Sequence, residues 1–375
     1  MPREKPALGA CSAHAYVSGG AWVESRRNLS DWIPTCANFA QKARYVCKGK
    51  EHAWTWRPSS HCADPPPLMD LLAGRTLFVM GDSFGFELFV EVGCRLQREG
   101  ARFIQTLKPW WAWQTNLPDR STGRVHTCST FSDARNRSRG RLCFVPVGTT
   151  GRYVPEGRNK QSVADALTYM ATVNVTRATD VVLANEGAWL DAQHLRQRAE
   201  ALRRAAVLSG APAHRRPISS WPLVVWRESY AQHFPTATGA YNLSRPWQGM
   251  QQMACTHIAA PVVKPEALVN VSRALLHDDR GEESTSVDVT ASDAREMVHP
   301  IALIDGWSLT SNLPLVHPGL VDDATRASDA SLNSTSRSRL DCTHICTFNG
   351  INDAVIDALS SHLSYVHSSR TQSVR

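Results

Sequence analysis

The chain has 375 residues, of which 42% are hydrophobic and 20% charged, and this composition is that of a globular protein rather than a disordered one. A chain of this length can bury a substantial core, which favours one large domain with an appendage over several small ones. The formal net charge of +7 at pH 7 favours anionic partners such as acidic polysaccharides. The basic residues form no Lys/Arg block, so we expect no nucleic-acid partner.

Cysteines and glycosylation motifs both indicate an oxidising compartment of the secretory pathway. An even number of cysteines predicts a set of disulfides among Cys11, Cys36, Cys47, Cys62, Cys94, Cys128, Cys143, Cys255, Cys342 and Cys346. N-x-S/T sequons predict glycosylation at Asn28, Asn136, Asn174, Asn242, Asn270 and Asn333. Residues 1–8 lack the apolar core of a signal peptide, and no window reaches the ~18–20 apolar residues of a membrane span. We therefore expect that an N-terminal signal or membrane anchor is missing from this chain.

The first 67 residues differ in composition from the rest. They contain four of the cysteines and four tryptophans, with few apolar runs long enough for a sheet. Such a composition is typical of a small disulfide-stapled module, and we expect its cysteines to pair largely among themselves. Three prolines at 65–67 form a stiff connector that can continue neither a helix nor a central strand. The predicted domains are therefore residues 1–67 and residues 68–375.

Residues 68–375 alternate between apolar strands and helices. A helical stretch at 84–98 follows the first strand, and a second helix is predicted at 191–208 from the spacing of its apolar residues. Strands are predicted at residues 76–80, 141–147, 180–185, 222–227 and 301–307. This alternation predicts a largely parallel sheet with helices on both faces. Two polar stretches, at 277–296 and 322–339, read as surface insertions.

Ser83 is the candidate nucleophile. The sequence around Gly81-Asp82-Ser83 reads strand, tight turn, helix, which places Ser83 at the carboxyl end of a strand and in the first turn of a helix. Backbone N–H groups and the helix dipole there favour negative charge on an attacked carbonyl oxygen. Alternatively, Ser83 or Asp82 only caps the helix. The spacing Gly81-x-Ser83-x-Gly85 also matches the nucleophile elbow of α/β-hydrolases, although too little sheet precedes the serine for that fold.

His344, with Asp341 three residues before it, is the candidate base. Its imidazole could deprotonate Ser83 while Asp341 fixes the tautomer, and this short spacing fits a GDS-type hydrolase fold better than an α/β-hydrolase. Cys342 and Cys346 could tie the turn down by disulfides. A zinc site at these positions is the alternative, but it lacks a second matching half, and cysteines in an oxidising compartment should be bridged, so we expect no metal.

Several segments in colinear order support a family resemblance. They are Ser18-Gly19-Gly20-Ala21-Trp22-Val23, Cys36, Cys47, Trp54-Thr55-Trp56-Arg57-Pro58, Cys62, Gly81-Asp82-Ser83, Asn185-Glu186-Gly187-Ala188-Trp189, Trp226-Arg227-Glu228-Ser229-Tyr230-Ala231-Gln232-His233-Phe234 and Asp341-Cys342-Thr343-His344-Ile345-Cys346. Together they resemble the trichome-birefringence-like family of plant cell-wall polysaccharide O-acetyltransferases, which is related to the PC-esterase group.

The resemblance implies an SGNH/GDSL-like three-layer α/β/α domain with a triad of Ser83, Asp341 and His344. It implies a Golgi-lumen enzyme that uses an acetyl donor, acetyl-CoA or another acetyl carrier, as co-substrate with no bound cofactor, and a polysaccharide as acceptor. By analogy, Asn185, together with the Ser83 N–H, lines the oxyanion hole, although Asn185 could equally be a strand-end turn residue. The other family-matched site residues are Gly187, Arg227 and His233. For Arg227 a buried ion pair, and for His233 a hydrogen-bonded structural histidine, are the alternatives.

One departure from the family pattern concerns the helix after Ser83. The family usually continues Gly-Asp-Ser with two residues and then Arg-Asn, where this chain has Phe86 and Glu87. Glu87 is four residues after Ser83, so both lie on the same helical face. We therefore expect acetyl transfer through a Ser83 acyl-enzyme, with two alternatives. One is a polysaccharide acetyl-esterase, in which water intercepts the same intermediate. The other is a polysaccharide-binding protein without turnover.

Overall fold

The computed structural model describes residues 9–25, 39, 53–58, 61–104, 128–135, 139–147, 162–172, 175–186, 192–210, 221–232, 255, 269, 271, 275, 301–313, 319–321, 339–342 and 345–372. The predicted site residues Gly187, His233 and His344 and the side chain of Asp341 lie outside the described part. So do the asparagines of all six sequons, residues 277–296 and 322–338 of the polar insertions, Cys36 and Cys47.

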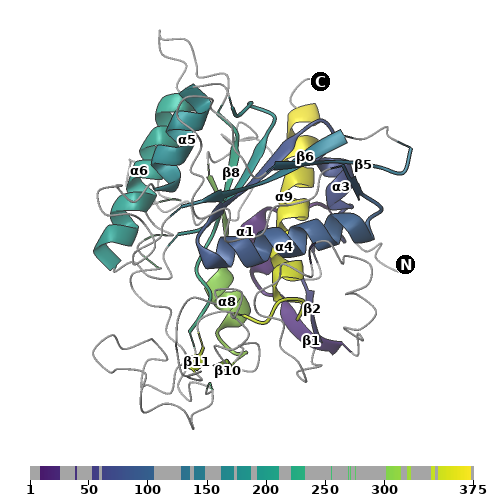
Figure 1. Cartoon of the computed structure of the whole chain (residues 1–375), viewed down its shortest axis with the longest axis vertical. Helices are drawn as coiled ribbons and strands as arrows, with labels where there is room; N and C mark the ends of the chain where they lie inside the picture. The colour runs from purple at the N-terminus through teal and green to yellow at the C-terminus, as the bar shows by residue number, and fades with distance from the viewer. Residues whose placement is uncertain are drawn as a thin grey trace, which may run out of the picture.

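A seven-stranded sheet forms the middle of the molecule (Figure 1). Its spatial order is β4 (Arg102–Phe103), β5 (Cys128–Ser132), β6 (Arg139–Pro146), β3 (Thr76–Gly81), β7 (Val181–Ala184), β8 (Leu223–Arg227) and β9 (Ile301–Ile304). The five strands from β6 to β9 are parallel, whereas β5 runs antiparallel to β6 and β4 antiparallel to β5. The prediction of a largely parallel sheet is confirmed.

Helices cover both faces of this sheet, because its central strands are apolar on both sides. In β3 the buried side chains of Leu77 and Val79 join one core, and those of Phe78 and Met80 join the other. The first core includes α4 (Ser83–Arg98) and α9 (Ile351–Gln372), and the second includes α5 (Val163–Thr172) and α6 (Ala192–Gly210). Figure 1 shows α5 and α6 side by side, away from α4 and α9. The arrangement has three layers, helices–sheet–helices.

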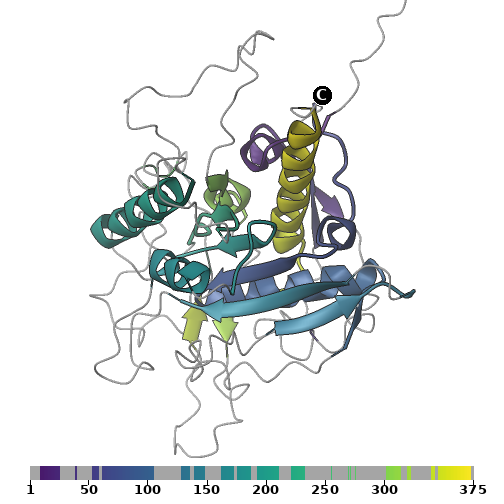
Figure 2. The ribbon, with the colours of Figure 1, turned by 90° about the horizontal axis from the view of Figure 1, so that it is seen from above.

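The N-terminal segments pack on the α9 side of the molecule. They include α1 (Ala13–Val17) and a two-stranded antiparallel sheet of β1 (Ala21–Ser25) and β2 (Ala53–Arg57). This sheet was not predicted, because residues 1–67 have few long apolar runs; it forms from two strands of only five residues each. Figure 2 shows α1 beside α9. The short α3 (Leu68–Leu71) then follows the prolines and leads into β3.

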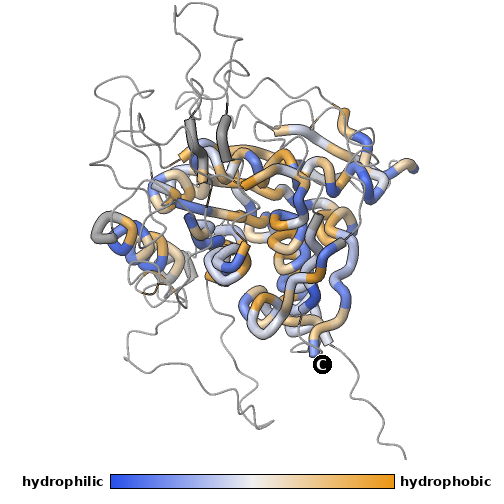
Figure 3. Tube along the Cα trace, turned by 90° about the horizontal axis from the view of Figure 1, so that it is seen from below, coloured by the Kyte–Doolittle hydropathy of each residue, from blue (hydrophilic) through white to orange (hydrophobic). Residues whose placement is uncertain are grey.

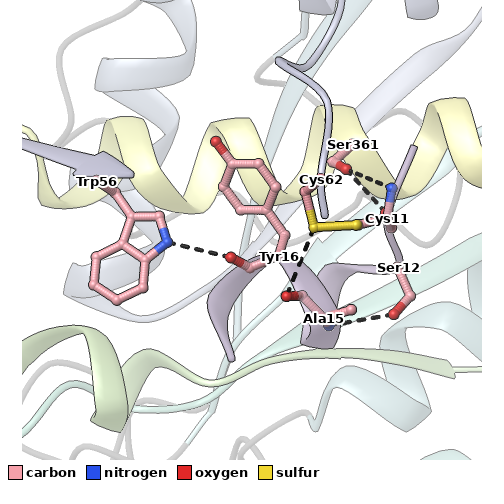
Figure 4. Close-up of a disulfide and its surroundings, with 7 residues drawn as sticks. All are labelled: Cys11, Ser12, Ala15, Tyr16, Trp56, Cys62 and Ser361. Atoms are coloured by element: carbon pink, nitrogen blue, oxygen red, sulfur yellow. Dashed lines mark hydrogen bonds between the residues drawn. A yellow bond between two sulfur atoms is a disulfide. The ribbon is translucent and has the colours of Figure 1, made fainter. Parts of the chain in front are cut away.

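A disulfide joins the two ends of this segment. Cys11 and Cys62 are bonded, with their Cα atoms 5.5 Å apart, which is one pair within residues 1–67. Ser361 of α9 accepts a hydrogen bond from the Cys11 N–H at 3.1 Å and donates one to the Cys11 carbonyl oxygen at 2.9 Å (Figure 4). The Trp56 indole N–H donates to the Tyr16 carbonyl oxygen at 3.2 Å. The disulfide and the Trp56 bond hold the N-terminal segment together, and the two Ser361 bonds attach it to α9.

Two local predictions need correction. The strand expected at 301–307 ends at Ile304, because Asp305 caps α8 (Gly306–Thr310) by accepting from the Ser308 N–H at 2.8 Å. The helix expected at 84–98 begins one residue earlier, at Ser83.

The remaining pair, β10 (Gly319–Val321) and β11 (Arg339–Asp341), forms a small antiparallel sheet of its own. Apolar residues gather in the middle of the molecule (Figure 3). None of the helices in the described residues is long and apolar enough to cross a membrane.

Candidate functional site

Ser83 is the first residue of α4, directly after β3. The Asp82 side chain caps the helix by accepting a hydrogen bond from the Phe84 N–H at 3.0 Å. Asp82 is buried, whereas Ser83 is partly exposed. Between the two capping alternatives, the structure therefore selects Asp82. Ser83 consequently occupies the first turn of a 16-residue helix, where the helix dipole favours negative charge.

The turn with Ser83 lies at the point of the sheet where the order in which strands are added reverses. Among the parallel strands, β3 comes first in the chain but does not lie at an edge. It pairs with β6 on one side and with β7 on the other. Taken in chain order, these strands have the spatial order 2-1-3-4-5, in which the crossovers leave β3 in opposite directions. In open α/β sheets, ligands bind at the carboxyl ends of the strands at such a switch point. Ser83 follows β3 at this point, and Asn185 follows β7.

Gly81 is required because Asn185 comes against the backbone of the turn. A Cβ atom at Gly81 would be 2.5 Å from the Asn185 side-chain Oδ1 and 3.1 Å from the Gly85 Cα. A Cβ at Gly85 would meet Asn185 Oδ1 at an ordinary 3.5 Å. The Gly-x-Ser-x-Gly spacing thus has a steric cause at its first glycine: the Asn185 amide fills the space that a side chain would need.

The Asn185 amide is buried without hydrogen-bond partners in the described part of the chain. The residue is 2% exposed, and neither Oδ1 nor Nδ2 is bonded there. Its backbone is held, since the Asn185 N–H donates to the Met80 carbonyl oxygen at 2.9 Å. A buried amide without partners costs about 1–3 kcal/mol. Such a group beside the turn of Ser83 is positioned to bond a ligand atom, which favours the oxyanion interpretation over a simple strand-end turn.

Phe86 and Glu87 stand where the family that the sequence resembles has Arg-Asn, and they have separate roles in the packing. The Phe86 ring is buried and packs edge-on against Phe144 of β6, with ring centroids 5.5 Å apart. The Glu87 carboxylate is buried on the face of α4 that begins at Ser83, and Thr347 Oγ1 donates to its Oε2 at 2.7 Å. Thr347 follows the predicted base His344 by three residues. Glu87 therefore joins the helix of Ser83 to the C-terminal segment.

Asp341 ends β11, where it pairs with Gly319 of β10. The next residue, Cys342, is fully buried and forms a disulfide with Cys255. Cys346 is disulfide-bonded as well. Both sulfurs are therefore unavailable as zinc ligands, and the disulfides predicted at these two cysteines are present. A further disulfide joins Cys128 to Cys143 across β5 and β6.

Arg227 ends β8 on the same side of the sheet as Asn185. Met80, Ala184 and Trp226 are aligned across the three strands, so the next residues along, including Asn185 and Arg227, share one face. Arg227 is fully buried, and its guanidinium carbon lies 4.2 Å from the Tyr230 ring centroid. Its Nη1 donates to the Glu228 carbonyl oxygen at 3.1 Å, while Nε and Nη2 have no partner in the described residues.

The alternative of a buried ion pair for Arg227 finds no support there, and aromatic stacking takes its place. Burial raises the pKa of the adjacent Tyr230 to about 12, so its hydroxyl is neutral at pH 7 and donates to Asn352 Oδ1.

Glu186 is a buried carboxylate at the site that sequence patterns did not single out for a role. Its Oε1 accepts from Arg198 Nη1 at 2.7 Å and from the Val163 N–H at 2.9 Å. Burial raises its pKa, and Arg198 opposes that shift. The contacts join the end of β7 to α5 and α6. We therefore assign Glu186 to holding the strand that presents Asn185.

No protein-family model matches the sequence, and a comparison with curated proteins gives no match either.

Proposed function

We propose that the protein is a serine acyltransferase whose nucleophile is Ser83. The observation that carries this proposal is the arrangement at the switch point of the sheet. Asp82 caps α4 and leaves Ser83 in its first turn. The buried amide of Asn185, which has no hydrogen-bond partner among the described residues, lies against that turn. Helix N–H groups and an amide N–H are the donors that stabilise an oxyanion in acyl transfer. A cap alone would not require a buried amide at this position to lack a partner in the described part of the chain.

Asp341 and His344 supply the base in this proposal. The contact between Thr347 and Glu87 supports it, because Glu87 lies one helical turn from Ser83 on the same face. The Cys342–Cys255 disulfide and the buried Cys346 hold the chain on both sides of His344. Sequence spacing and these anchors together favour His344 as the group that exchanges a proton with Ser83.

The proposed reaction has two steps. His344 takes the Ser83 hydroxyl proton as Oγ bonds to the acetyl carbonyl carbon of the donor. Asn185 Nδ2 and the Ser83 N–H donate to the resulting oxyanion. When the bond to the donor's leaving group breaks, that group takes the proton from His344 and acetyl-Ser83 remains. A sugar hydroxyl then attacks the acetyl carbon and passes its proton through His344 to Ser83 Oγ, which leaves.

The acetyl group and the polysaccharide acceptor in this proposal rest on the resemblance to the trichome-birefringence-like O-acetyltransferases. The strand order 2-1-3-4-5 with Ser83 after the first strand agrees with the SGNH-like fold that the resemblance implies. The disulfides are consistent with a secreted or lumenal protein, and the resemblance specifies the Golgi lumen.

Mass spectrometry of the protein after incubation with an acetyl donor tests the proposal. Acetyl-Ser83 is expected, with faster loss to an unacetylated glycan oligomer than to buffer alone. Equal loss with and without the oligomer would indicate an esterase. Ser83→Ala should abolish the adduct, and Asn185→Ala should lower its rate of formation by about 10²–10³-fold. A Ser83→Ala protein that still transfers acetyl groups would refute the assignment.

A further inference from the structure

A row of buried polar side chains runs along α4 from Ser83. Glu87 and Glu91 follow the serine at intervals of four residues, so the three lie on one face of the helix. Each glutamate is only 2% exposed, although most neighbouring positions in the helix are buried apolar residues. Buried carboxylates are rare without hydrogen-bond partners, and the partners of these two identify what they hold.

Both carboxylates bond the segment directly after the predicted base. Glu87 Oε2 accepts from Thr347 Oγ1 at 2.7 Å. Glu91 Oε1 accepts from the Phe348 backbone N–H at 3.0 Å and from Asn352 Nδ2 at 2.7 Å. The bonds join positions 257 to 261 residues apart in the chain. Successive turns of α4 therefore hold successive points of residues 347–352.

The backbone of residues 347–352 has two residues with positive φ and is held by hydrogen bonds on both sides. Phe348 has a φ of 69°, which is uncommon for a residue other than glycine, and Gly350 has a φ of 98°. The Asn349 carbonyl oxygen accepts from the Trp54 N–H of β2 at 2.8 Å. Asn349 Oδ1 accepts from the Ile351 N–H at 3.0 Å and begins α9. The segment is thus fixed against α4 on one side and against β2 on the other.

The register of these bonds limits how far the chain just before Thr347 can lie from Ser83. Four residues of helix place the Glu87 and Ser83 Cα atoms about 6 Å apart along the axis. Three residues of chain reach at most about 11 Å, so the contact of Thr347 with Glu87 sets an upper limit on how far His344 can lie from Ser83. A slip of the segment by one turn toward Glu91 would add about 5.4 Å to that separation.

We propose that Glu87 and Glu91 are positioning residues that hold residues 347–352 in one register on the helix of Ser83. This inference deepens the proposed function and rests on it. An apolar face would serve stability equally well, because replacing buried polar contacts by packed apolar ones is often neutral. Directed hydrogen bonds instead select one register, and Glu87 gives this chain a contact with Thr347 at a position where the related family has asparagine.

The test compares substitutions that remove one buried hydroxyl. Thr347→Val deletes the bond to Glu87 while keeping the shape of the side chain, and Thr347→Ser retains the hydroxyl. Ser361→Ala is the matched control, because it removes a buried hydroxyl that bonds Cys11 twice, away from α4. The first measurement is the rate, across pH, at which a fluorophosphonate probe modifies Ser83 with loss of fluoride. The second is amide hydrogen exchange of residues 345–352.

We expect Thr347→Val to slow modification of Ser83 about 10–100-fold well below its unfolding temperature, because small displacements of a base have effects of this size. Ser361→Ala should change the rate by about twofold or less, and Thr347→Ser should stay close to the parent protein. Exchange of residues 345–352 should rise in Thr347→Val and not in Ser361→Ala.

The outcomes separate this inference from the proposed function. A parent protein whose Ser83 does not react, or a Ser83→Ala protein labelled at the parent rate, would refute the function. Hydrogen exchange would still decide the inference in that case. If exchange of residues 345–352 is the same in Thr347→Val and Ser361→Ala, the positioning role is wrong. It is also wrong if Ser83 reacts at the same rate in these two variants.

Discussion

The two faces of the sheet are built differently. On the α5/α6 side the described core is apolar, and charged contacts such as that of Glu186 with Arg198 lie at the strand ends. On the α4/α9 side, carboxylates are buried between the helices. They include Glu87 and Glu91, and nearby Arg95 and Arg98 pair with aspartates of α9. The first face requires only good packing, whereas the second specifies which residues of α9 meet which residues of α4. The polar contacts that fix which residues meet are therefore concentrated on the face with the candidate nucleophile.

Gly350→Ala, on the α4/α9 side, should lower the free energy of unfolding more than any other substitution considered below. A Cβ there would be 1.8 Å from the Trp54 carbonyl oxygen, and the φ of 98° also disfavours any other residue. We expect a loss of about 4 kcal/mol in the free energy of unfolding, measured by urea titration. Gly100→Ala is the control, since its φ is 96° and a Cβ there would meet nothing within 4 Å. It should lose only about 1 kcal/mol, and equal losses would show that the contact with β2 is unimportant.

Arg198→Met tests the strand-end contact of the other face. The substitution leaves the Glu186 carboxylate buried without its cation, and breaking such a pair costs about 3 kcal/mol when the acid can take up a proton instead. Arg196 lies in the same helix and pairs with Glu200 at 2.8 Å, but its side chain is 61% exposed. Arg196→Met should therefore cost about 0.5 kcal/mol or less. Denaturant unfolding of both variants measures the difference, and similar values would contradict the assigned role of Glu186.

Glu91→Gln should stabilise the α4/α9 side in a pH-dependent way. Burial raises the pKa of Glu91 from 4.5 to about 8, with Asp353 adding to the shift and Arg98 opposing it. Between these values the folded state keeps a proton that the unfolded state has lost, so the stability of the parent protein falls as pH rises. Glutamine keeps an oxygen acceptor for Phe348 and Asn352 without that penalty. Its advantage should be absent below pH 4.5 and reach about 2 kcal/mol near pH 8.

Unfolding titrations at several pH values measure this advantage. A difference between Glu91→Gln and the parent protein that stays constant from pH 4 to pH 9 would contradict the burial argument.

His362→Leu should have the smallest of these effects, and only in acid. Burial lowers the pKa of His362 from 6.5 to about 4, so the unfolded state takes up a proton at a higher pH than the folded state does. The stability of the parent protein therefore falls as pH drops from 6.5 to 4, by about 1–2 kcal/mol from this residue. The leucine variant should lack that part of the decline. His367→Leu is the control, because His367 is exposed on the same helix, and thermal unfolding at pH 4 and 7 measures both.

Patterns along the chain predicted the strands β3, β6, β7 and β8 and the helices α4 and α6, because continuous apolar runs and helical spacing mark them. They did not predict α9. Its buried surface includes Asn352, Asp353 and His362, and these polar positions hide the apolar spacing on which a helix prediction depends. The short strands β1 and β2 escaped for a related reason, since their tryptophans are only partly buried.

Only the part of the candidate site that lies at the ends of strands could be predicted from the sequence. Ser83 and Asn185 follow apolar strands, so a parallel sheet brings them to one edge. The bonds of Glu91 with Phe348 and Asn352 connect residues more than 250 positions apart, and no local pattern reports such a pair. The only available signal was the spacing of Ser83, Glu87 and Glu91, which places two acids in line with the serine on an otherwise apolar helix.

The position of α9 in the chain determines when this side of the molecule can be completed during synthesis. The residues that cover Glu87 and Glu91 begin at position 347, and the residue that bonds Cys11 is Ser361. At about 5–20 residues per second, roughly 12–50 seconds separate the translation of α4 from that of its partner segment. For that time a new chain presents the Glu87 and Glu91 carboxylates and the apolar surface around them before residues 347–352 have been made. The α5/α6 side can pack earlier, so the face with Ser83 is the one that stays incomplete longest while the chain is still growing.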